Sequence, residues 1–268
     1  PCVRCGGSFD KTHPYQGLHA FLYLITPTPA VIGYTRSSTV ADSVSVFYRV
    51  PRMGVERLAD DGGPFGFDIT TALAVDDLIT LYGCDAVVET GCHLGDTTHY
   101  LARRYPSLPV YSCDLDPAYA AFTRHRVAGH RNARVEHVDS PALVAAAAGI
   151  HERPLFFLDA HWGPDWPLAR ELAAVAAGVV VIHDFDIGHP RFAFDVYGDL
   201  VCGPAMLAAM SRPPEVYFTP DPAADWPLPC LQTRRRAGVG ILTVGLDTAP
   251  LQKHPHLTTR YLERAVTP

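Results

Sequence analysis

The stretch from Asp85 to Asp116 constrains the fold more strongly than any other part of the chain. Its sequence, DAVVETGCHLGDTTHYLARRYPSLPVYSCDLD, predicts a buried strand at 86–90, a tight turn, a helix at 96–105 and a second strand at 110–113. The turn contains Gly91 and Gly95, and glycine lets a backbone approach a ligand closely. The helix start adds unpaired N–H groups, and Asp114 ends the second strand where a ribose diol would be held. The stretch therefore predicts the nucleotide-binding unit of a parallel α/β fold.

Strands and helices alternate through the residues around this unit. Further strands are predicted at 134–138, 155–158 and 179–182, and further helices at 70–82, 118–128, 142–148 and 168–177. This alternation is typical of a parallel sheet with helices on both faces. The later strands run into Asp139, Asp159 and the pair His183-Asp184. Because open α/β sheets bind ligands at the carboxyl ends of their strands, we expect a ligand site there.

The acids of the first turn indicate which nucleotide the unit would bind. The pattern is Glu89-x-Gly91-x-x-x-Gly95, not G-x-G-x-x-G, and Asp96 opens the following helix. Negative charge there would repel a pyrophosphate but suits a ligand with ammonium and sulfonium centres. The pattern resembles the first motif, E/D-x-G-x-x-x-G, of class I S-adenosylmethionine-dependent methyltransferases. The resemblance covers about residues 69–244.

The resemblance implies a Rossmann-like, seven-stranded sheet with helices on both faces and an antiparallel last strand. A helix at 204–210 and strands at 215–219 and 237–244 fit that ending. It also implies S-adenosylmethionine as cofactor. The cofactor-binding set would be Glu89, Gly91, Gly95, Thr97, Asp114, Asp139 and Ser140. In that set, the glycines leave room for the methionine end, Glu89 neutralises it, Asp114 accepts from the ribose, and Asp139 and Ser140 flank the adenine.

Two segments, Leu158-Asp-Ala-His-Trp and Ile182-His-Asp-Phe-Asp, carry the expected acceptor chemistry. They resemble the metal-dependent O-methyltransferases of catechols and of macrolide or coumarin sugars, which hold a magnesium ion after the fourth and fifth strands. The resemblance implies that Asp159, His183 and Asp184 would be its ligands here. Magnesium prefers oxygen ligands, so His183 departs from the pattern and leaves open a softer metal or a lost one. His161 is the candidate general base, with packing against Trp162 as its alternative role. The expected acceptor-binding residues are Trp162, Phe185 and Asp186.

Acidic residues gather in the loops after the last two parallel strands of the predicted sheet. They are Asp159, Asp165, Asp184, Asp186, Asp195 and Asp199. Without a metal they would attract a cation, which favours an aminoglycoside-like acceptor methylated on nitrogen, with His161 taking the proton. Methylation of a hydroxyl on a sugar or catechol, with catalysis by Asp159, Asp184 and a divalent metal, is the alternative.

Composition narrows the partners and the compartment. The chain has 268 residues with 22 basic and 28 acidic side chains and lacks a basic stripe, so we expect a small-molecule acceptor and no nucleic acid. Its longest apolar stretch, 18–33, contains Pro27 and Pro29, so we expect no membrane span and a cytoplasmic protein. Seven scattered cysteines do not suggest a disulfide scaffold. Cys84, Cys92 and Cys113 are expected in the core. Cys2-x-x-Cys5 is expected to be a frayed thiol pair that can form a disulfide in air, with zinc bound together with His13, His19 or a distant partner as the alternative.

Residues 1–65 differ in composition from the core expected at 66–268. They are rich in Pro, Gly, Ser and Thr, with β-like runs at 21–26 and 43–50. We expect a cap over the cofactor or a segment exchanged in a homodimer, with a passive tail as the alternative. Two other functions stay open: a nicotinamide-dependent oxidoreductase, which Glu89 and Asp96 disfavour, and an inactive methyltransferase-like binding protein, which should have lost Asp114 or the glycines.

Overall fold

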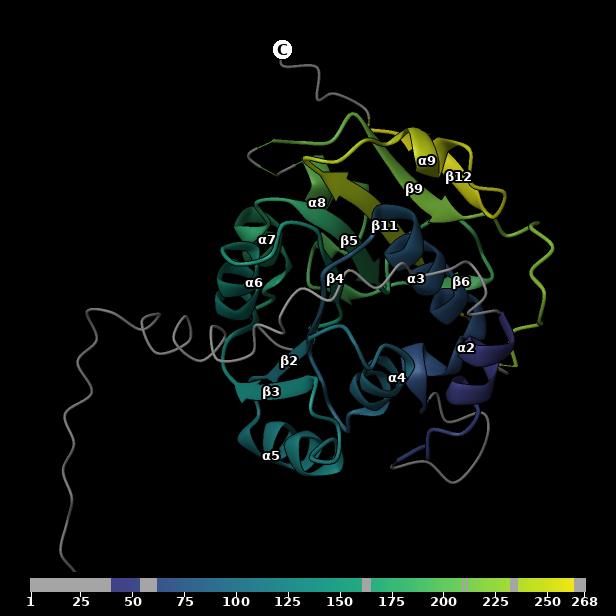
Figure 1. Ribbon diagram of the computed structural model, residues 1–268. Coiled ribbons are helices and arrows are strands. Elements are labelled where there is room, and N and C mark those ends of the chain that lie inside the picture. Colours follow the sequence, from purple (N-terminus) through teal and green to yellow (C-terminus); the bar gives the residue numbers. More distant parts are fainter. Residues whose placement is uncertain are drawn as a thin grey trace, which may run out of the picture.

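An eight-stranded sheet organises the protein in a computed structural model (Figure 1). The residues it describes are 40–53, 62–160, 165–208, 210, 212–231 and 236–262. The strands of this sheet are β1 (Ala86–Thr90), β2 (Val110–Asp114), β3 (Ala133–His137), β4 (Pro154–Leu158), β5 (Gly178–His183), β9 (Val216–Pro220), β11 (Val239–Val244) and β12 (Leu257–Tyr261). They lie in the order β12-β9-β11-β5-β4-β1-β2-β3. The expected Rossmann-like sheet is confirmed, with β12 as an additional strand.

The first five strands are parallel, and the sheet turns antiparallel beyond β5. β1 pairs in parallel with both β2 and β4, so the chain reverses its direction of travel across the sheet between these two neighbours. Ligands bind in open α/β sheets at such a switch point, outside the carboxyl ends of the strands. β11 is antiparallel to β5 and β9, and β12 is antiparallel to β9. The expected antiparallel strand is therefore β11, which lies between β5 and β9.

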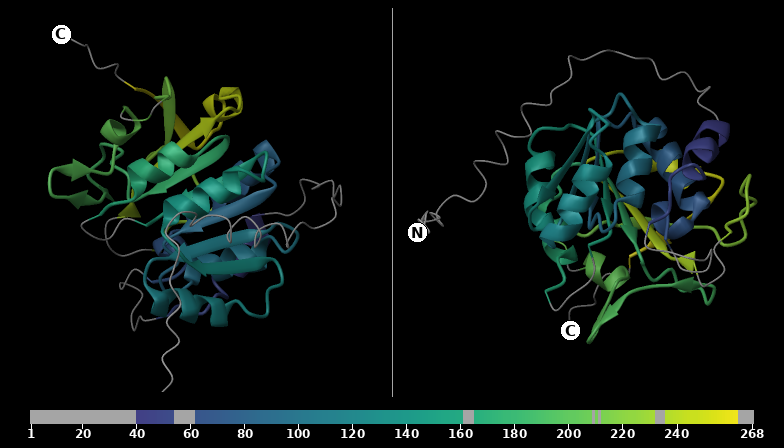
Figure 2. Two further views of the ribbon diagram at one scale, coloured as in Figure 1. Left: turned by 90° about the vertical axis from the view of Figure 1, so that its left-hand side faces the viewer. Right: turned by 90° about the horizontal axis from the view of Figure 1, so that it is seen from below.

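Helices cover both faces of the sheet (Figures 1 and 2). They are α2 (Val40–Phe47), α3 (Ile69–Tyr82), α4 (Asp96–Arg104), α5 (Pro117–Arg126), α6 (Ser140–Ala148), α7 (Leu168–Ala174), α8 (Pro204–Ala208) and α9 (Ala249–Gln252), with a short 3-10 turn, η1 (Pro64–Phe67). Alternate residues of a strand face opposite sides. In β1, Val87 belongs to the core under α3 and α4, and Val88 to the core under α6 and α7. This explains why apolar side chains occupy consecutive positions in the central strands, which are buried on both faces.

One predicted element is wrong. The run Ser43–Val50, expected to be β-like from its valines and aromatic residues, is mostly helix α2. Its Phe47 is 1% exposed and packs against Phe67 and Tyr100, ring centroids 5.6 and 6.0 Å away. Packing on η1 and α4 thus outweighs the intrinsic β preference of the run.

The segment before α3 is joined to the core. Phe65 is fully buried, and its ring lies 5.4 Å from that of Tyr100 and 5.0 Å from that of Phe157. The predicted domain boundary at residue 65 therefore falls inside η1. The β-like run at 21–26 lies outside the described residues.

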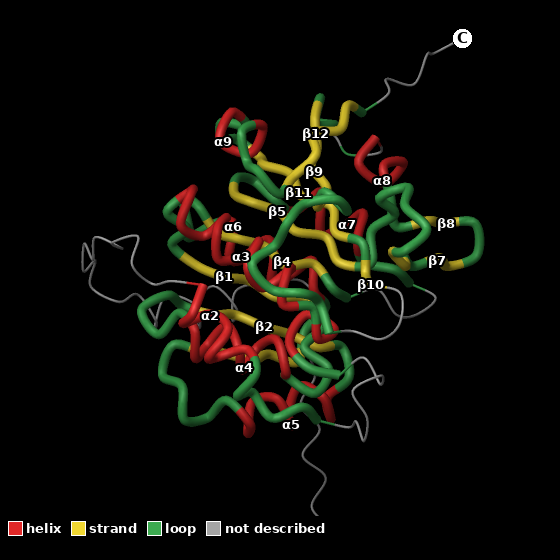
Figure 3. The backbone as a smooth tube through the Cα atoms, turned by 90° about the vertical axis from the view of Figure 1, so that its right-hand side faces the viewer, coloured by secondary structure: helices red, strands yellow, loops and turns green. Residues whose placement is uncertain are grey.

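Short elements follow β5 that the sequence did not indicate. The chain forms β6 (Phe192–Ala193), the β7–β8 hairpin (Val196–Tyr197 and Leu200–Val201) and β10 (Arg236–Ala237), which pairs with β6. The predicted strand at 237–244 is thus divided into β10 and β11. Figure 3 shows the β7–β8 hairpin standing away from the body. Among the described residues, no helix is both long and apolar enough to cross a bilayer.

Candidate active site

The turn after β1 lies at the switch point, held against the end of β4. Gly91 has φ +77°, and a Cβ there would lie 2.8 Å from the carbonyl oxygen of Asp159. Gly95 has φ +74°, and a Cβ there would lie 2.6 Å from a side-chain atom of Thr123. Both positions require glycine because the protein's own atoms occupy the space that a side chain would fill.

Glu89 is buried beneath this turn. Glu89 is 2% exposed. Its Oε2 accepts hydrogen bonds from Ser112 Oγ, at 2.5 Å, and from Thr98 Oγ1. Burial raises the pKa of Glu89 to about 7, although these two hydroxyl groups favour the charged form. A cation nearby would also favour the charged form, so a positively charged ligand above Glu89 would favour loss of its proton.

Asp114 presents its carboxylate at the end of β2. Oδ2 accepts from the backbone N–H of His93 at 2.8 Å, and Oδ1 accepts from that of Asp116 at 2.9 Å. Oδ2 also accepts weakly from Cys92 Sγ at 3.8 Å, Oδ1 keeps a lone pair for a further donor, and the residue is partly exposed. The next residue, Leu115, is 71% exposed, which leaves an apolar surface beside the carboxylate. The Asp114 carboxylate and the Leu115 side chain together are suited to bind a sugar diol attached to an apolar ring.

The first residues of α4 bind the segment before α3. Phe65 N–H donates to Thr97 Oγ1 at 2.9 Å, and Gly63 N–H donates to Asp96 Oδ2 at 2.8 Å. Asp96 also pairs with Arg126, with Oδ1 and Nη1 2.7 Å apart. Thr97, which was expected to bind the cofactor, is 8% exposed, and its hydroxyl already accepts a backbone hydrogen bond.

Asp139 and Ser140 lie where β3 passes into α6. Asp139 Oδ2 accepts from Arg170 Nη1 at 2.6 Å. Ser140 is 5% exposed and lies beside Glu171, a fully buried acid on α7. Burial raises the pKa of Glu171 to about 7 against the effect of the Ser140 and Thr90 hydroxyls. Asp139 is thus the more accessible of the two predicted residues.

The ends of β4 and β5 bring together Asp159, His183, Asp184 and Asp195. His183 Nδ1 lies 3.0 Å from Asp159 Oδ1 and 3.2 Å from Asp184 Oδ2. Burial opposes a charge on His183, but the two carboxylates outweigh it and raise the pKa of this ring well above its usual value. Burial, with Asp184 and Asp159 close by, raises the pKa of Asp195 to about 6. The group is a cluster of three carboxyl groups around one imidazole ring.

Backbone strain marks the same edge of the sheet. Asp184 has φ +50° and His93 has φ +44°, values that residues with side chains rarely adopt. Such strain costs about 1–3 kcal/mol per residue and concentrates at functional sites. Here it turns Asp184 back toward His183 at the point where β5 ends.

The other predicted acceptor residues have different positions. Phe185 is 0% exposed and its ring packs on Gly240 and Tyr217, so it belongs to the core and not to a pocket wall, because the chain turns it inward after β5. Asp186 Oδ1 accepts from Gly188 N–H at 2.8 Å and shapes the following turn. His161 and Trp162 lie outside the described residues. Of the six acids, only Asp159, Asp184 and Asp195 belong to the group around His183; Asp165 is 95% exposed at its side chain and Asp199 is exposed.

All three predicted core cysteines, Cys84, Cys92 and Cys113, are buried as expected. Cys2 and Cys5 lie outside the described residues. Leu115, Glu171 and the grouping of Asp195 with His183 were not predicted from the sequence. A large apolar residue directly after a strand-end acid was the available signal for Leu115, whereas contacts across separate helices and loops left none for Glu171.

Comparisons with known proteins find likeness only among solved structures. No protein-family model matches the chain, and no curated protein does. Among solved structures, one from work on the conversion of a disulfide bond into a thioacetal group during echinomycin biosynthesis shares 18% identity over 80% of this chain and 95% of that chain, with a TM-score of 0.43. An rRNA methylase from Streptococcus thermophilus shares 15% identity over 65% of this chain and 95% of that chain, with a TM-score of 0.38. A mycolic acid cyclopropane synthase complexed with SAH shares 18% identity over 43% of this chain and 44% of that chain, with a TM-score of 0.30.

For three other solved structures the chain spans 49%, 66% and 44% of the other protein's length. The strand order is what identifies the architecture: five parallel strands with the switch between β1 and β4, then an antiparallel strand inserted before the last parallel one. This is the strand order that the resemblance to class I methyltransferases predicts. β12 adds a further edge strand to it.

A separate open pocket of about 760 Å³ lies beside the start of α3. Its lining includes Arg191, Trp226 and Arg236, and none of the four residues grouped around His183. Arg236 already pairs with the buried Asp68, with Nε and Oδ2 2.8 Å apart, and its guanidinium lies 4.9 Å from the Phe192 ring centroid. The pocket is therefore separate from the acidic group.

Proposed function

We propose that this protein is an S-adenosylmethionine-dependent methyltransferase acting on an amine or hydroxyl of a polar small molecule. The observation that carries the proposal is Asp114, a partly exposed carboxylate fixed by two backbone N–H groups across from the β1 turn. A carboxylate held in this way is preorganised to accept from two neighbouring hydroxyl groups. Leu115 beside it is suited to pack against adenine.

The residues present fit that cofactor. Asp114 would hold the ribose, and Leu115 and Asp139 would border the adenine with Ser140 beneath it. Glu89 would balance the charge of the methionine ammonium group. Gly91 and Gly95 shape the turn between β1 and α4 that would border the cofactor. When bound, S-adenosylmethionine supplies an electrophilic methyl group on a positive sulfur. The chain's own residues then bind and orient the acceptor, exclude water and accept a proton.

The acidic group around His183 would receive the acceptor. Asp159 and Asp184 are 27% and 23% exposed at their side chains, so each can still contact a ligand while pairing with His183. Negative charge there favours a cationic acceptor, such as an amino sugar or an aminoglycoside-like intermediate in natural-product synthesis. An amine attacks only when neutral, and His161 is the proposed base that takes its proton.

Metal-dependent methylation of a hydroxyl is the second candidate. The favouring observation is that Asp159, His183 and Asp184 each offer a ligand atom, all within 4.8 Å of one another. However, His183 Nδ1 lies between the two carboxylates, where a hydrogen on this nitrogen would satisfy both contacts without a metal ion. Magnesium also prefers an all-oxygen set. We therefore favour the metal-free enzyme.

Two measurements test the proposal. Calorimetric titration with S-adenosylhomocysteine should show saturable binding, and no binding at millimolar excess would refute the cofactor assignment. Transfer of labelled methyl groups from S-adenosylmethionine should then be assayed on matched panels of aminoglycosides, neutral sugars and catechols. Turnover on amino sugars that survives EDTA supports the favoured form, whereas turnover on catechols that needs a divalent ion supports the second.

A further inference from the structure

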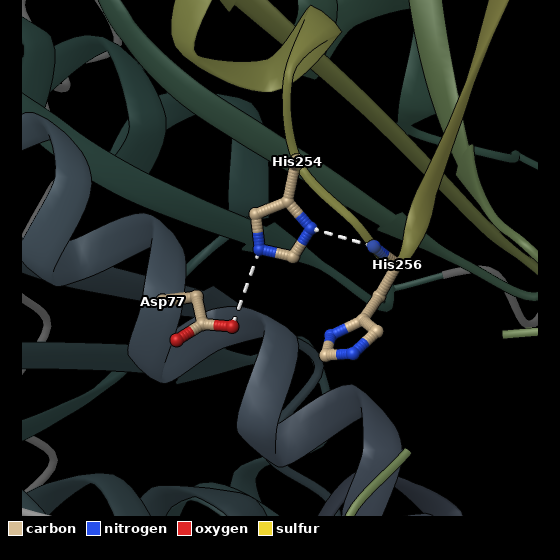
Figure 4. A group of neighbouring side chains, drawn as sticks. All are labelled: Asp77, His254 and His256. Carbon is tan, nitrogen blue, oxygen red and sulfur yellow. Dashed lines mark hydrogen bonds and ion pairs between the residues drawn. The ribbon is translucent and has the colours of Figure 1, made fainter. Parts of the chain in front are cut away.

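The geometry points to a transition-metal site formed by Asp77, His254 and His256, away from the proposed active site. Asp77 lies on α3, and the two histidines lie in the turn between α9 and β12, separated by Pro255. The three side chains each offer one ligand atom, and these atoms lie within 4.8 Å of one another. Figure 4 shows the carboxylate and both rings arranged around one gap. This inference is independent of methyl transfer.

The ligand types and spacing suit zinc. Zinc sites with an open position commonly use three protein ligands, imidazole nitrogens and a carboxylate among them, with water as the fourth. Asp77 Oδ2 and His254 Nε2 already lie 3.2 Å apart, close to the separation of two ligands on one tetrahedral ion. The side chain of Asp77 is 51% exposed, so an ion and its water can enter from solvent.

His256 supplies the second, independent indication. Its Nδ1 is buried and has no hydrogen-bond partner among the described residues. A buried nitrogen without a partner is costly, and a bound cation would use its lone pair. Trp226 packs against the ring in a tilted arrangement at a centroid distance of 4.3 Å, and the His256 carbonyl accepts from Asp221 N–H at 2.9 Å. Ring and backbone are thus both held in place before any ion arrives.

Binding requires one change at His254. Its Nδ1 accepts from the backbone N–H of His256 at 3.2 Å, so the neutral ring carries its proton on Nε2, facing Asp77. Coordination through Nε2 moves that proton to Nδ1 and gives up this one long hydrogen bond. No atom is gained or lost by the ring, and the ion replaces the proton between His254 and Asp77.

An ion there would join two parts of the chain that are distant in sequence. Asp77 and His254 are 177 positions apart, and α3 leads directly into β1 while the histidine turn leads into β12. Because the metal binds only the folded arrangement, it should raise the unfolding temperature in proportion to its affinity.

The test is zinc binding by equilibrium dialysis, with thermal unfolding of the same samples, on the full chain. The wild type should bind about one more zinc ion per chain than His254→Ala, and Asp77→Asn should weaken that binding at least about tenfold. His125→Ala, which removes an exposed histidine on α5, is the matched control and should behave as wild type. The Asp77→Asn variant keeps the test decisive if His254→Ala does not fold.

Two outcomes would overturn the inference. One is equal zinc stoichiometry and equal thermal shift in wild type, Asp77→Asn and His254→Ala. The other is a Co²⁺ complex whose spectrum shows thiolate ligation and persists in Asp77→Asn, which would assign the bound ion to cysteines.

Discussion

Asp159 and His183 face each other across the ends of β4 and β5, with Oδ1 3.0 Å from Nδ1. We place a hydrogen on Nδ1, where it would satisfy this contact and make the nitrogen a donor instead of a metal ligand. We therefore expect methyl transfer to continue after dialysis against EDTA, with a rate within roughly twofold of the untreated enzyme. Recovery only on adding magnesium or another divalent ion would contradict this.

Asp114 should control cofactor affinity. Replacing it in Asp114→Asn removes the charge that accepts from the ribose, a loss of about 1.5–3 kcal/mol, or about 10- to 100-fold in the dissociation constant of S-adenosylhomocysteine. Asp116→Asn is the control, because Asp116 caps α5 by accepting from Ala118 N–H at 2.7 Å. It should leave affinity unchanged, and calorimetry on both variants decides. Equal affinities would remove Asp114 from the site.

Glu89 should make stability fall as pH rises. Its pKa is about 7 in the folded protein against the usual 4.5, so the folded state keeps a proton that the unfolded state releases. The stabilisation is fully present below pH 4.5 and is lost as pH rises through about 7. Urea unfolding should show Glu89→Gln gaining about 1–3 kcal/mol on wild type between about pH 4.5 and pH 8. The exposed Glu152→Gln should show no such gain, and a flat difference for Glu89→Gln would disprove the assignment.

The ion pair between Arg104 and Asp76 should be a major contributor to stability. Arg104 Nη2 lies 2.7 Å from Asp76 Oδ1, with the two side chains 4% and 13% exposed, and Arg104 Nε donates to Ser43 on α2 at 2.9 Å. Arg104→Met leaves a buried carboxylate without its partner and should cost about 3–5 kcal/mol in urea unfolding. Its exposed neighbour gives the control, Arg103→Met, expected within about 0.5 kcal/mol of wild type. Similar values for the two variants would show that the pair contributes little.

Gly91 should tolerate no side chain. Gly91→Ala combines a left-handed backbone with a Cβ 2.8 Å from the Asp159 carbonyl, and we expect a loss of about 3 kcal/mol or more. Gly83→Ala, at φ +57° with nothing within 4 Å of the new Cβ, isolates the backbone cost at about 1 kcal/mol. Chemical denaturation of both variants should show the difference, which disappears if β4 can move away from β1.

The parallel half of the fold could be predicted because apolar runs and strand-end acids repeat regularly there. Glu89, Asp114 and Asp159 could be placed at the right edge of the sheet for the same reason. The sequence could not show that Phe185 turns inward, because alternation stops where β5 ends. It also could not show α2, which depends on packing against η1 and α4, or β12, a short edge strand beyond the region with a clear pattern. The pairing of His183 with two carboxylates depends on the separation of β4 and β5, which no local pattern encodes.

The hydrogen bonds from Gly63 and Phe65 to the first two residues of α4 have a practical consequence. Both amide protons are donated to side chains at the start of α4, which directly follows the β1 turn proposed to border the cofactor. Occupation of the crevice would alter their environment directly, so their chemical shifts in an NMR titration would report ligand entry without any labelled cofactor. The N–H groups of Gly63 and Phe65 thus provide NMR signals that would report ligand binding.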